Sequence, residues 1–415
     1  MKRLTICGGR PLCGEVAVSG FKNAALPVLF ATILIRDICV IENLPLIRDV
    51  GQTLDILRAM GARISYLSPH TAEIDTRALR QGGAPDALVS SFRASSYLLG
   101  AELSRFGRAG VALPGGCRIG ARPLDLHLLV LSALGADTAY TGDGIFAAAS
   151  RLVGNDIFLP TPSVGATVNA LLASVLAEGE TVIHGAAREP HIVDLALFLN
   201  AAGGDIRGAG EGEIRVRGVA SLHGVRHTVM PDMIEAGTFL TSVGAAGGEI
   251  RLIGALPDHL ASLTAPLREM GVSLLFEREG LLASRCGPLF PFCLTAEPYP
   301  GFPTDMHPQM IALSAFAEGV SYLTDTVFPD RFAYAGELAK MGADIHVKDG
   351  SVKVCGGGLS GARVQAHDLR AGAALAVAAL GATGRTVIGG AEILERGYED
   401  FPTKLRALGA DVGEA

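Results

Sequence analysis

One cysteine in this 415-residue chain stands in a context that favours reactivity. Cys117 follows the glycine-rich segment 114–116 and is flanked by Arg118 and Arg122. Neighbouring guanidinium groups stabilise a thiolate, so we expect an accessible thiol with a lowered pKa at this position. Such a group can act as a nucleophile or as a proton donor. From the spacing alone, an unreactive surface thiol is an equally good interpretation. The other cysteines, such as Cys39 in an apolar run, are expected to be core or surface residues.

Polar and charged residues also gather where apolar segments begin. They are Lys22-Asn23, Arg93, Ser163-Val164-Gly165, Asp232 with Glu235, Thr304-Asp305, and Asp368 with Arg370. Helix N-termini offer free backbone N–H groups and a positive dipole end, so these starts would suit anionic substrates if they converge. Helix capping alone accounts for Thr304 and Asp368, each taken singly. It does not account for Lys22 and Arg93, whose charges oppose the dipole unless an anion binds there.

One short phrase recurs six times along the chain. A glycine follows an amphipathic segment and precedes a short alternating run at Gly61, Gly135, Gly203, Gly271, Gly342 and Gly409, which lie 74, 68, 68, 71 and 67 residues apart. The pattern is typical of a glycine that ends a helix and leads into a strand. Because the spacing is nearly equal, we interpret the chain as six copies of one unit.

Each unit also has a first half that predicts an apolar helix followed by a strand. Clear examples are helices at 24–34, 167–177 and 369–380 and strands at 39–41, 181–183 and 386–388. A helix that is apolar all round must be buried, so we place these helices inside a layer of sheets. That location accounts for a composition with 49% hydrophobic and only 19% charged residues.

The composition also excludes several classes of protein. The longest stretch free of polar residues, 371–382, has 12 residues, whereas a membrane span takes about 20. A net charge of −7 offers no electrostatic footprint for nucleic acid or for an anionic membrane surface. Seven cysteines without a CxxC pair argue against a structural zinc site. The first ten residues lack the apolar core of a secretion signal. We therefore expect a cytoplasmic protein that acts on small molecules without a metal or other cofactor.

Six motifs, in order along the chain, resemble those of the UDP-N-acetylglucosamine 1-carboxyvinyltransferase family, the enolpyruvyl transferases that open peptidoglycan precursor synthesis. The motifs are residues 19–27 (SGFKNAALP), the loop 114–127, and residues 163–167 (SVGAT), 187–190 (AREP), 302–306 (FPTDM) and 396–399 (RGYE). The resemblance extends from the first predicted strand to the last repeat.

The resemblance implies an α/β fold of two similar domains, described as a two-domain inside-out α/β barrel. Each domain would hold three β-α-β-α-β-β units around buried parallel helices, with the active site in the cleft between the domains. In that family the chain starts in the second domain and crosses early. We therefore expect residues 22–230 to form the domain with the Cys117 loop, and residues 1–21 with 231–415 to form the other. The repeats by themselves do not reveal this crossover.

The implied reaction transfers the enolpyruvyl group of phosphoenolpyruvate to the 3-hydroxyl of UDP-N-acetylglucosamine and releases phosphate, by addition and elimination through a tetrahedral intermediate. It needs an acid for the methylene carbon, a base for the sugar hydroxyl, and cations for a phosphate and a carboxylate. By resemblance, Cys117 is the proton donor and the position alkylated by fosfomycin, and Asp305 is the base. No cofactor is implied.

The resemblance also assigns the binding residues. Lys22, Arg122 and Arg396 match the phosphoenolpyruvate clamp, with Arg93, Arg331 and Arg370 in support. Without the resemblance, Arg331 and Arg370 would be interpreted as members of surface ion pairs. The residues implied for the nucleotide sugar are Asn23, Arg122, Pro123, Leu124, Asp125, Leu126, Ser163, Val164, Gly165 and Val327. Thr161 departs from the pattern, because some family members place a diphosphate-binding Lys there. Phe21 and His307-Pro308 depart too, and we expect both to be tolerated.

Three other functions compete with this one. The sister enzyme that acts on shikimate 3-phosphate shares the implied fold but lacks the Pro-Gly-Gly-Cys loop and the KNAALP phrase. A catalytically silent paralogue that binds UDP-sugar would not need Cys117, Asp305 and the full cationic set. An RNA-end-processing protein built on related units would favour a basic surface, which a net charge of −7 does not supply.

Overall fold

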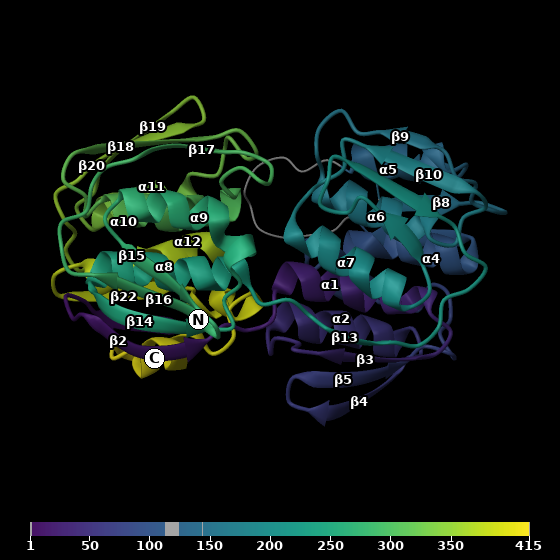
Figure 1. Ribbon diagram of the computed structural model, residues 1–415, viewed down its shortest axis with the longest axis horizontal. Coiled ribbons are helices and arrows are strands. Elements are labelled where there is room, and N and C mark those ends of the chain that lie inside the picture. The colour runs from purple at the N-terminus through teal and green to yellow at the C-terminus, as the bar shows by residue number, and fades with distance from the viewer. Residues whose placement is uncertain (1, 113–123, 143, 415) are drawn as a thin grey trace. The chain divides into compact units, whose positions relative to one another are not determined.

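The computed structural model describes residues 2–112, 124–142 and 144–414, which Figure 1 shows as a ribbon. These residues form two compact units. We call residues 2–19 with 231–414 the terminal unit, and residues 20–112, 124–142 and 144–230 the central unit. The chain enters the central unit between Ser19 and Gly20 and leaves it between Met230 and Pro231.

The central unit contains three of the predicted repeats. Its elements are α1 (Lys22–Ala31), η1 (Thr32–Leu34), β3 (Ile38–Glu42), α2 (Arg48–Ala59), β4 (Arg63–Ser68), β5 (Thr71–Asp75), α3 (Asp86–Val89), η2 (Arg93–Tyr97), α4 (Leu98–Phe106), β6 (Arg108–Ala112), α5 (Asp125–Ala133), β7 (Asp137–Tyr140), β8 (Gly144–Ala148), β9 (Asp156–Phe158), α6 (Val164–Ser174), β10 (Glu180–His184), α7 (Pro190–Ala201), β11 (Asp205–Arg207), β12 (Glu213–Arg217) and β13 (Arg226–Thr228).

The terminal unit contains the other three repeats and the first two strands of the chain. Its elements are β1 (Arg3–Cys7), β2 (Leu12–Ala17), α8 (Met233–Ala246), β14 (Gly248–Ile253), α9 (Pro257–Glu269), β15 (Ser273–Glu277), β16 (Gly280–Arg285), β17 (Cys293–Ala296), η3 (Thr304–Met306), α10 (His307–Ser314), β18 (Val320–Asp325), α11 (Ala333–Lys340), β19 (Asp344–Lys348), β20 (Ser351–Cys355), β21 (Arg363–Gln365), α12 (Leu369–Gly381), β22 (Arg385–Gly389), η4 (Ala391–Arg396), α13 (Phe401–Ala407) and β23 (Asp411–Glu414).

The six repeat glycines end helices, as the sequence predicts. All six have a positive φ, from 83° at Gly409 to 107° at Gly61. Glycine reaches this region without a steric penalty and is therefore the usual residue just after a helix. At Gly61 a Cβ would also lie only 3.0 Å from the carbonyl oxygen of Ala78. The repeated phrase thus marks six equivalent helix-to-strand turns.

Each repeat contributes one sheet. The strand orders are β13-β3-β5-β4, β6-β8-β7, β11-β12-β10-β9, β15-β16-β14-β2, β17-β18-β20-β19 and β21-β22-β1-β23. Each four-stranded sheet combines one parallel pair with two antiparallel pairs, and strand β1 completes the last one by pairing with β22 and β23.

Two strands belong to the unit that the chain is about to leave. Strand β2 precedes α1 in sequence but pairs in parallel with β14 of the terminal unit, and the purple β2 lies beside β14 in Figure 1. Strand β13 precedes α8 but pairs in parallel with β3 of the central unit. At each passage, the last strand before the chain leaves a unit therefore stays paired within that unit.

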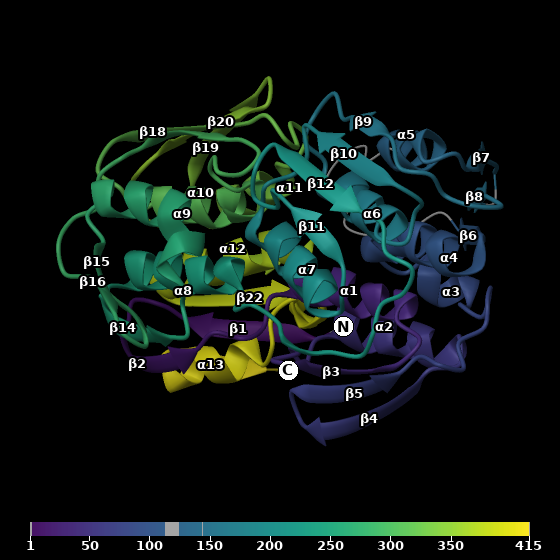
Figure 2. The same cartoon turned by 45° about the vertical axis from the view of Figure 1, so that its right-hand side comes forward.

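The first helix of each repeat is buried, as its composition predicts. All eight residues of α10 are buried, and so are residues 369–380 of α12. In the terminal unit α8, α10 and α12 pack against one another, and in the central unit α4 contacts α1 and α6. Figure 2 shows α8, α10 and α12 between the sheet that contains β18 and those that contain β22 and β14. The apolar composition is therefore explained by helices enclosed between sheets.

Two kinds of feature are missing from the described ranges. No helix there is both long and apolar enough to span a bilayer. No group of three or more His, Cys, Asp or Glu side chains there is arranged to hold a metal ion.

Glu102 on α4 gives the fold a predicted pH dependence. Its side chain is buried, and burial raises its pKa to about 7, although the backbone N–H groups of Gly82 and Gly110 oppose the shift. Because the folded state then binds more protons than the unfolded state between the ordinary pKa near 4.5 and about 7, stability falls as the pH rises through that window. We expect Glu102→Gln to remove up to about 3 kcal/mol of this fall, measured by urea unfolding on either side of the window.

Glu249→Gln is a suitable control, because Glu249 is exposed. This variant should keep the pH dependence of the wild type. The interpretation would be wrong if Glu102→Gln kept it as well.

Candidate active site

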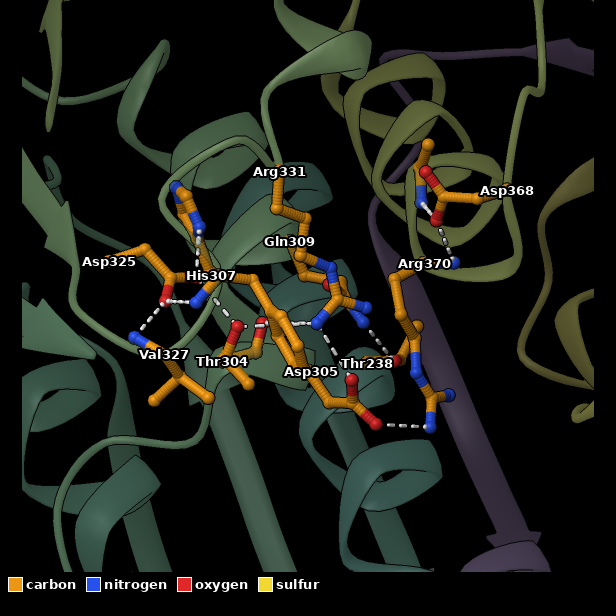
Figure 3. A network of polar contacts seen from close by, with 12 residues as sticks. Thr238, Thr304, Asp305, His307, Gln309, Asp325, Val327, Arg331, Asp368 and Arg370 are labelled. Atoms are coloured by element: carbon orange, nitrogen blue, oxygen red, sulfur yellow. Dashed lines mark hydrogen bonds and ion pairs between the residues drawn. The ribbon is translucent and has the colours of Figure 1, made fainter. Parts of the chain in front are cut away.

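Two guanidinium groups hold the carboxylate of Asp305 in the terminal unit (Figure 3). Arg331 Nη1 donates to Asp305 Oδ1 at 2.9 Å, and Arg370 Nη2 donates to Oδ2 at 3.0 Å. The two arginine side chains are only 5% and 4% exposed, whereas that of Asp305 is 27% exposed. Asp305 lies in η3 just before α10, and Arg370 is the second residue of α12. The starts of two buried helices therefore meet at this carboxylate, as the sequence predicts for helix starts.

This cluster keeps Asp305 ionised. Burial raises the pKa of Asp305, but the charges of Arg370 and Arg331 overcome that effect and hold it well below its usual range. Burial acts to lower the pKa of Arg370, but Asp305, Tyr398 and Asp232 raise it above its usual value. Because both arginines are buried, the interpretation of Arg331 and Arg370 as surface ion pairs is wrong. They are desolvated cations whose retained charge suits binding of an anion.

The cluster extends from Arg370 to Tyr398. The Tyr398 hydroxyl accepts a hydrogen bond from Arg370 Nη1 at 3.1 Å and one from Gln309 Nε2 at 3.3 Å, and it lies 3.0 Å from Thr238 Oγ1. Burial raises the pKa of Tyr398, so the hydroxyl stays protonated. Arg396, two residues earlier, ends η4 and is partly exposed. The 396–399 motif thus supplies a buried hydroxyl that orients Arg370.

Capping explains three of the polar helix starts but not Thr304. Ser163, Asp232 and Asp368 are N-caps whose side chains accept backbone N–H groups of α6, α8 and α12. Thr304 is the first residue of η3, and its hydroxyl donates to Asp325 Oδ2 at 2.6 Å. The prediction of Thr304 as an N-cap is therefore wrong, because Pro303 stands at the cap position of η3 and no side chain caps this helix. The Asp325 carboxylate also accepts the backbone N–H of Val327 at 2.9 Å.

In the central unit an ion pair orients Lys22. Lys22 begins α1, and its Nζ lies 2.8 Å from Oδ2 of Asp49 on α2. The Lys22 side chain is 14% exposed and that of Asp49 is 2% exposed. Asn23 follows on α1 and is partly exposed, while Arg93 begins η2. The cationic start of α1 is thus held by a buried carboxylate on the neighbouring helix.

The start of α6 packs directly against α5. A Cβ at Gly165 would lie 2.7 Å from His127 Cε1, so only glycine allows the imidazole this close. His127 Nδ1 is 2.7 Å from Asn169 Nδ2, and Asn169 Oδ1 accepts the backbone N–H of Gly100 at 2.7 Å. These contacts bring the start of α6, which includes Val164, next to the turn of residues 124–126 that opens α5. Leu124 is buried, Asp125 is exposed and Leu126 is partly exposed.

The predicted residues are divided between the two units, and three of them lie outside the described residues. Cys117, Arg122 and Pro123 lie outside the described residues. Thr161 is described and is exposed, just ahead of the Ser163 cap. Lys22, Asn23, Arg93 and the residues at the starts of α5 and α6 belong to the central unit, whereas Asp305, Val327, Arg331, Arg370 and Arg396 belong to the terminal unit.

Sequence reasoning missed four residues that position the predicted ones, namely Asp49, His127, Asn169 and Asp325. Asn169 carried a signal, since it is the one amide side chain in α6, a helix that otherwise holds only apolar residues, glycine and two hydroxyl residues. Asp325 ends a strand, where a polar residue is common, and Asp49 lies in an ordinary amphipathic helix. Nothing local separates these two from surface carboxylates.

A cavity of about 960 Å³ lies elsewhere in the central unit. Its lining includes Arg105 and Phe106 at the end of α4, Arg108 at the start of β6, and Glu178 and Gly179 beyond α6. None of the residues predicted for catalysis or binding lines it. It lies at the opposite ends of α4 and α6 from the starts that carry those residues.

The whole chain matches solved enolpyruvyl transferases in fold. It superposes on the enolpyruvyl transferase NikO from Streptomyces tendae with a TM-score of 0.91 and 31% identity, over 100% of this chain and 99% of that one. It also superposes on EPSP synthase from Acinetobacter baumannii with a TM-score of 0.77 and 21% identity, over the full length of both chains. The predicted fold of two domains built from repeated α/β units is thereby confirmed.

The sequence comparisons define the family. The sequence model of EPSP synthase (3-phosphoshikimate 1-carboxyvinyltransferase) matches residues 6–405. UDP-N-acetylglucosamine 1-carboxyvinyltransferase 1 of Streptococcus agalactiae serotype Ia is 44% identical, and UDP-N-acetylglucosamine 1-carboxyvinyltransferase 2 of Carboxydothermus hydrogenoformans is 45% identical, each over 99% of both chains. The chain belongs to the enolpyruvyl transferase family, in the branch of the UDP-N-acetylglucosamine 1-carboxyvinyltransferases, and is an enzyme.

Proposed function

We propose that this enzyme transfers the enolpyruvyl group of phosphoenolpyruvate to the 3-hydroxyl of UDP-N-acetylglucosamine, with release of phosphate, as the first committed step of peptidoglycan precursor synthesis. The names of the full-length relatives support this acceptor. Shikimate 3-phosphate is less well supported, because the EPSP synthase structure shares 21% identity and thus the fold alone. The reaction proceeds by addition and elimination through a tetrahedral intermediate.

The observation that carries the proposal is the carboxylate of Asp305 between two buried guanidinium groups. With both arginines in place, the lowered pKa makes Asp305 a weak base. An anionic substrate that binds Arg331 and Arg370 would neutralise part of their charge and so raise the pKa of Asp305. Phosphoenolpyruvate carries a phosphate and a carboxylate, so its binding would ready Asp305 to accept the proton of the sugar hydroxyl.

The remaining roles follow the family motifs. Lys22, Arg122 and Arg396 bind phosphoenolpyruvate, with Arg93 in support, and Cys117 supplies the proton for the methylene carbon. Asn23, residues 122–126 and 163–165, and Val327 bind the nucleotide sugar. The start of α6 offers backbone N–H groups for the diphosphate. The exposed Thr161 beside it carries no charge to add to them.

The proposal is tested by phosphate release with phosphoenolpyruvate and UDP-N-acetylglucosamine, each omitted in turn. Phosphate should appear only when both are present, and mass spectrometry should show a product that carries both the enolpyruvyl and the nucleotide-sugar groups. Absence of release above background would exclude the transferase and favour a silent UDP-sugar-binding paralogue. Release with shikimate 3-phosphate in place of the nucleotide sugar would favour the sister reaction.

Loss of the Lys22 orientation should affect one substrate selectively. Asp49→Asn removes the charge that holds Lys22 Nζ, so the ammonium group loses a fixed position. We expect KM for phosphoenolpyruvate to rise by about 5- to 10-fold, since a charge-assisted contact is worth roughly 1–2 kcal/mol, while KM for the nucleotide sugar changes less. Steady-state kinetics with each substrate varied decides this. Asp55→Asn, an exposed carboxylate on the same helix α2, should change neither constant.

We further propose a cytoplasmic location and sensitivity to fosfomycin through Cys117. Neither proposal requires nucleic acid, a membrane or a cofactor.

A further inference from the structure

Asp325, at the end of β18, is a buried carboxylate with no role in the reaction described so far. It is 1% exposed and accepts four hydrogen bonds. Its Oδ2 accepts from Thr304 Oγ1 at 2.6 Å and His307 Nδ1 at 3.0 Å, and its Oδ1 accepts from the backbone N–H groups of Val327 at 2.9 Å and Phe328 at 2.8 Å. Four donors fill the lone-pair sites of a carboxylate. Asp325 is therefore fixed from both sides.

His307 is a neutral connector in this network. Its Nδ1 lies against the Asp325 carboxylate and therefore carries the proton, while Nε2 lies 2.8 Å from the Tyr334 hydroxyl and accepts from it. His307 and Tyr334 are 0% and 1% exposed. Burial lowers the pKa of His307, although Asp325 opposes the shift. Tyr334 therefore donates to His307, and His307 donates to Asp325.

The network reaches Asp305 through two side chains. The Thr304 hydroxyl donates a hydrogen bond to Asp325, so its lone pairs are left to accept one from Arg331. Arg331 Nη1 lies 3.2 Å from Thr304 Oγ1 and 3.2 Å from the Thr304 carbonyl oxygen. The same Nη1 donates to Asp305 Oδ1 at 2.9 Å. Figure 3 shows Asp325 between Val327 on one side and the Thr304–Arg331–Asp305 contacts on the other.

We propose that Asp325 and His307 are positioning residues of the transferase, which set the Val327 turn and the Asp305 carboxylate at a fixed spacing from each other. The inference rests on the proposed function, in which Val327 contacts the nucleotide sugar and Asp305 takes the proton of its hydroxyl. Asp325 touches neither substrate nor the reacting atoms. It acts by holding both segments at one carboxylate, so that the sugar hydroxyl and its base come into reaction geometry together.

The test compares Asp325→Asn with Tyr334→Phe. An Asn side chain offers one oxygen and one NH₂ group, so two of the four donors lose their acceptor whichever way the amide turns. Tyr334→Phe removes only the hydroxyl that holds His307 Nε2 and keeps the buried ring. We expect kcat to fall about 100-fold in Asp325→Asn, since misplacement of the reacting groups by about 1 Å lowers the rate by about that factor. In Tyr334→Phe we expect a smaller fall, of about 5-fold. KM for UDP-N-acetylglucosamine should rise several-fold in both, with KM for phosphoenolpyruvate changed by less than twofold.

A purely structural role is distinguished by a control in the same buried layer. Ser314→Ala removes a hydrogen bond from Ser314 Oγ to the Ile311 carbonyl (2.8 Å) at the other end of α10. It should lower thermal stability without changing kcat. Kinetics are corrected for the folded fraction measured by circular dichroism, and Tyr334→Phe decides the question if Asp325→Asn does not fold.

Two outcomes would overturn the positioning role. One is unchanged kcat and KM in the folded variants, and the other is an equal rise of KM for both substrates. Activity of the wild type in the same assay separates this inference from the proposed function. An inactive wild type would overturn the proposed function and this inference with it, whereas an active wild type with normal variants would overturn the inference alone.

Discussion

Asp305→Asn is expected to lower kcat by about 10³-fold, the size of effect that a positioned general base supplies. The amide cannot accept the hydroxyl proton, yet it has nearly the same shape as the carboxylate. The substitution also leaves Arg331 and Arg370, both almost fully buried, without their shared counter-charge. Two uncompensated cations attract phosphoenolpyruvate more strongly, so we expect its KM to stay constant or fall.

Two measurements distinguish a base from a binding residue at this position. Titration calorimetry should show that the affinity for UDP-N-acetylglucosamine changes far less than kcat does. Asp330→Asn, an exposed neighbour of Arg331 with the same change of charge, should leave kcat unchanged. A loss of nucleotide-sugar affinity in Asp305→Asn as large as the loss of kcat would refute the base assignment.

The second large effect concerns Cys117. Cys117→Ser should severely lower turnover at neutral pH, because a serine hydroxyl holds its proton far more tightly than a thiol does. It should also abolish covalent labelling by fosfomycin, followed by mass spectrometry of the intact protein. Fosfomycin is an anionic epoxide, so it should select a thiol that lies among cations.

The other cysteines make this experiment specific. Cys13, Cys286 and Cys293 are exposed and are expected to react with a neutral alkylating reagent. Burial raises the pKa of Cys39 to about 11, which leaves it a poor nucleophile. Cys286→Ser should therefore lose one site for the neutral reagent and keep full labelling by fosfomycin. Fosfomycin labelling that persists in Cys117→Ser would show that another thiol is the reactive one.

Much of the architecture could be predicted from local sequence. The turn glycines recur because each follows a helix and needs a positive φ, and all six have it. The apolar helices could be recognised because a segment without a polar face must be buried, as α10 and α12 are. Lys22 and Arg93 could be identified as unusual because a cation at a predicted helix start opposes the helix dipole, whereas the role of Asp305 came from the family resemblance alone.

Other features depend on residues that are far apart in the chain. The pairing of β2 with β14 and of β13 with β3 joins strands that lie more than 180 residues apart in the chain, and no local pattern distinguishes these strands from their equivalents in other repeats. The pairing of β1 with β23 depends likewise on residues about 400 positions apart. Strand propensity specifies that a segment extends, but the partner is selected by packing.

The sequence by itself determined the six repeats, the buried helices and the chemical types of the groups at their starts, because these follow from periodicity, glycine conformation and charge. Only the tertiary structure decided that Arg331 and Arg370 are buried against Asp305, that Asp49 holds Lys22, and that the hydroxyl of Thr304 donates to Asp325. The physical reason is that a charge or a hydroxyl is satisfied by whichever partner the folded chain brings within hydrogen-bond distance, and that partner is set by packing of distant segments.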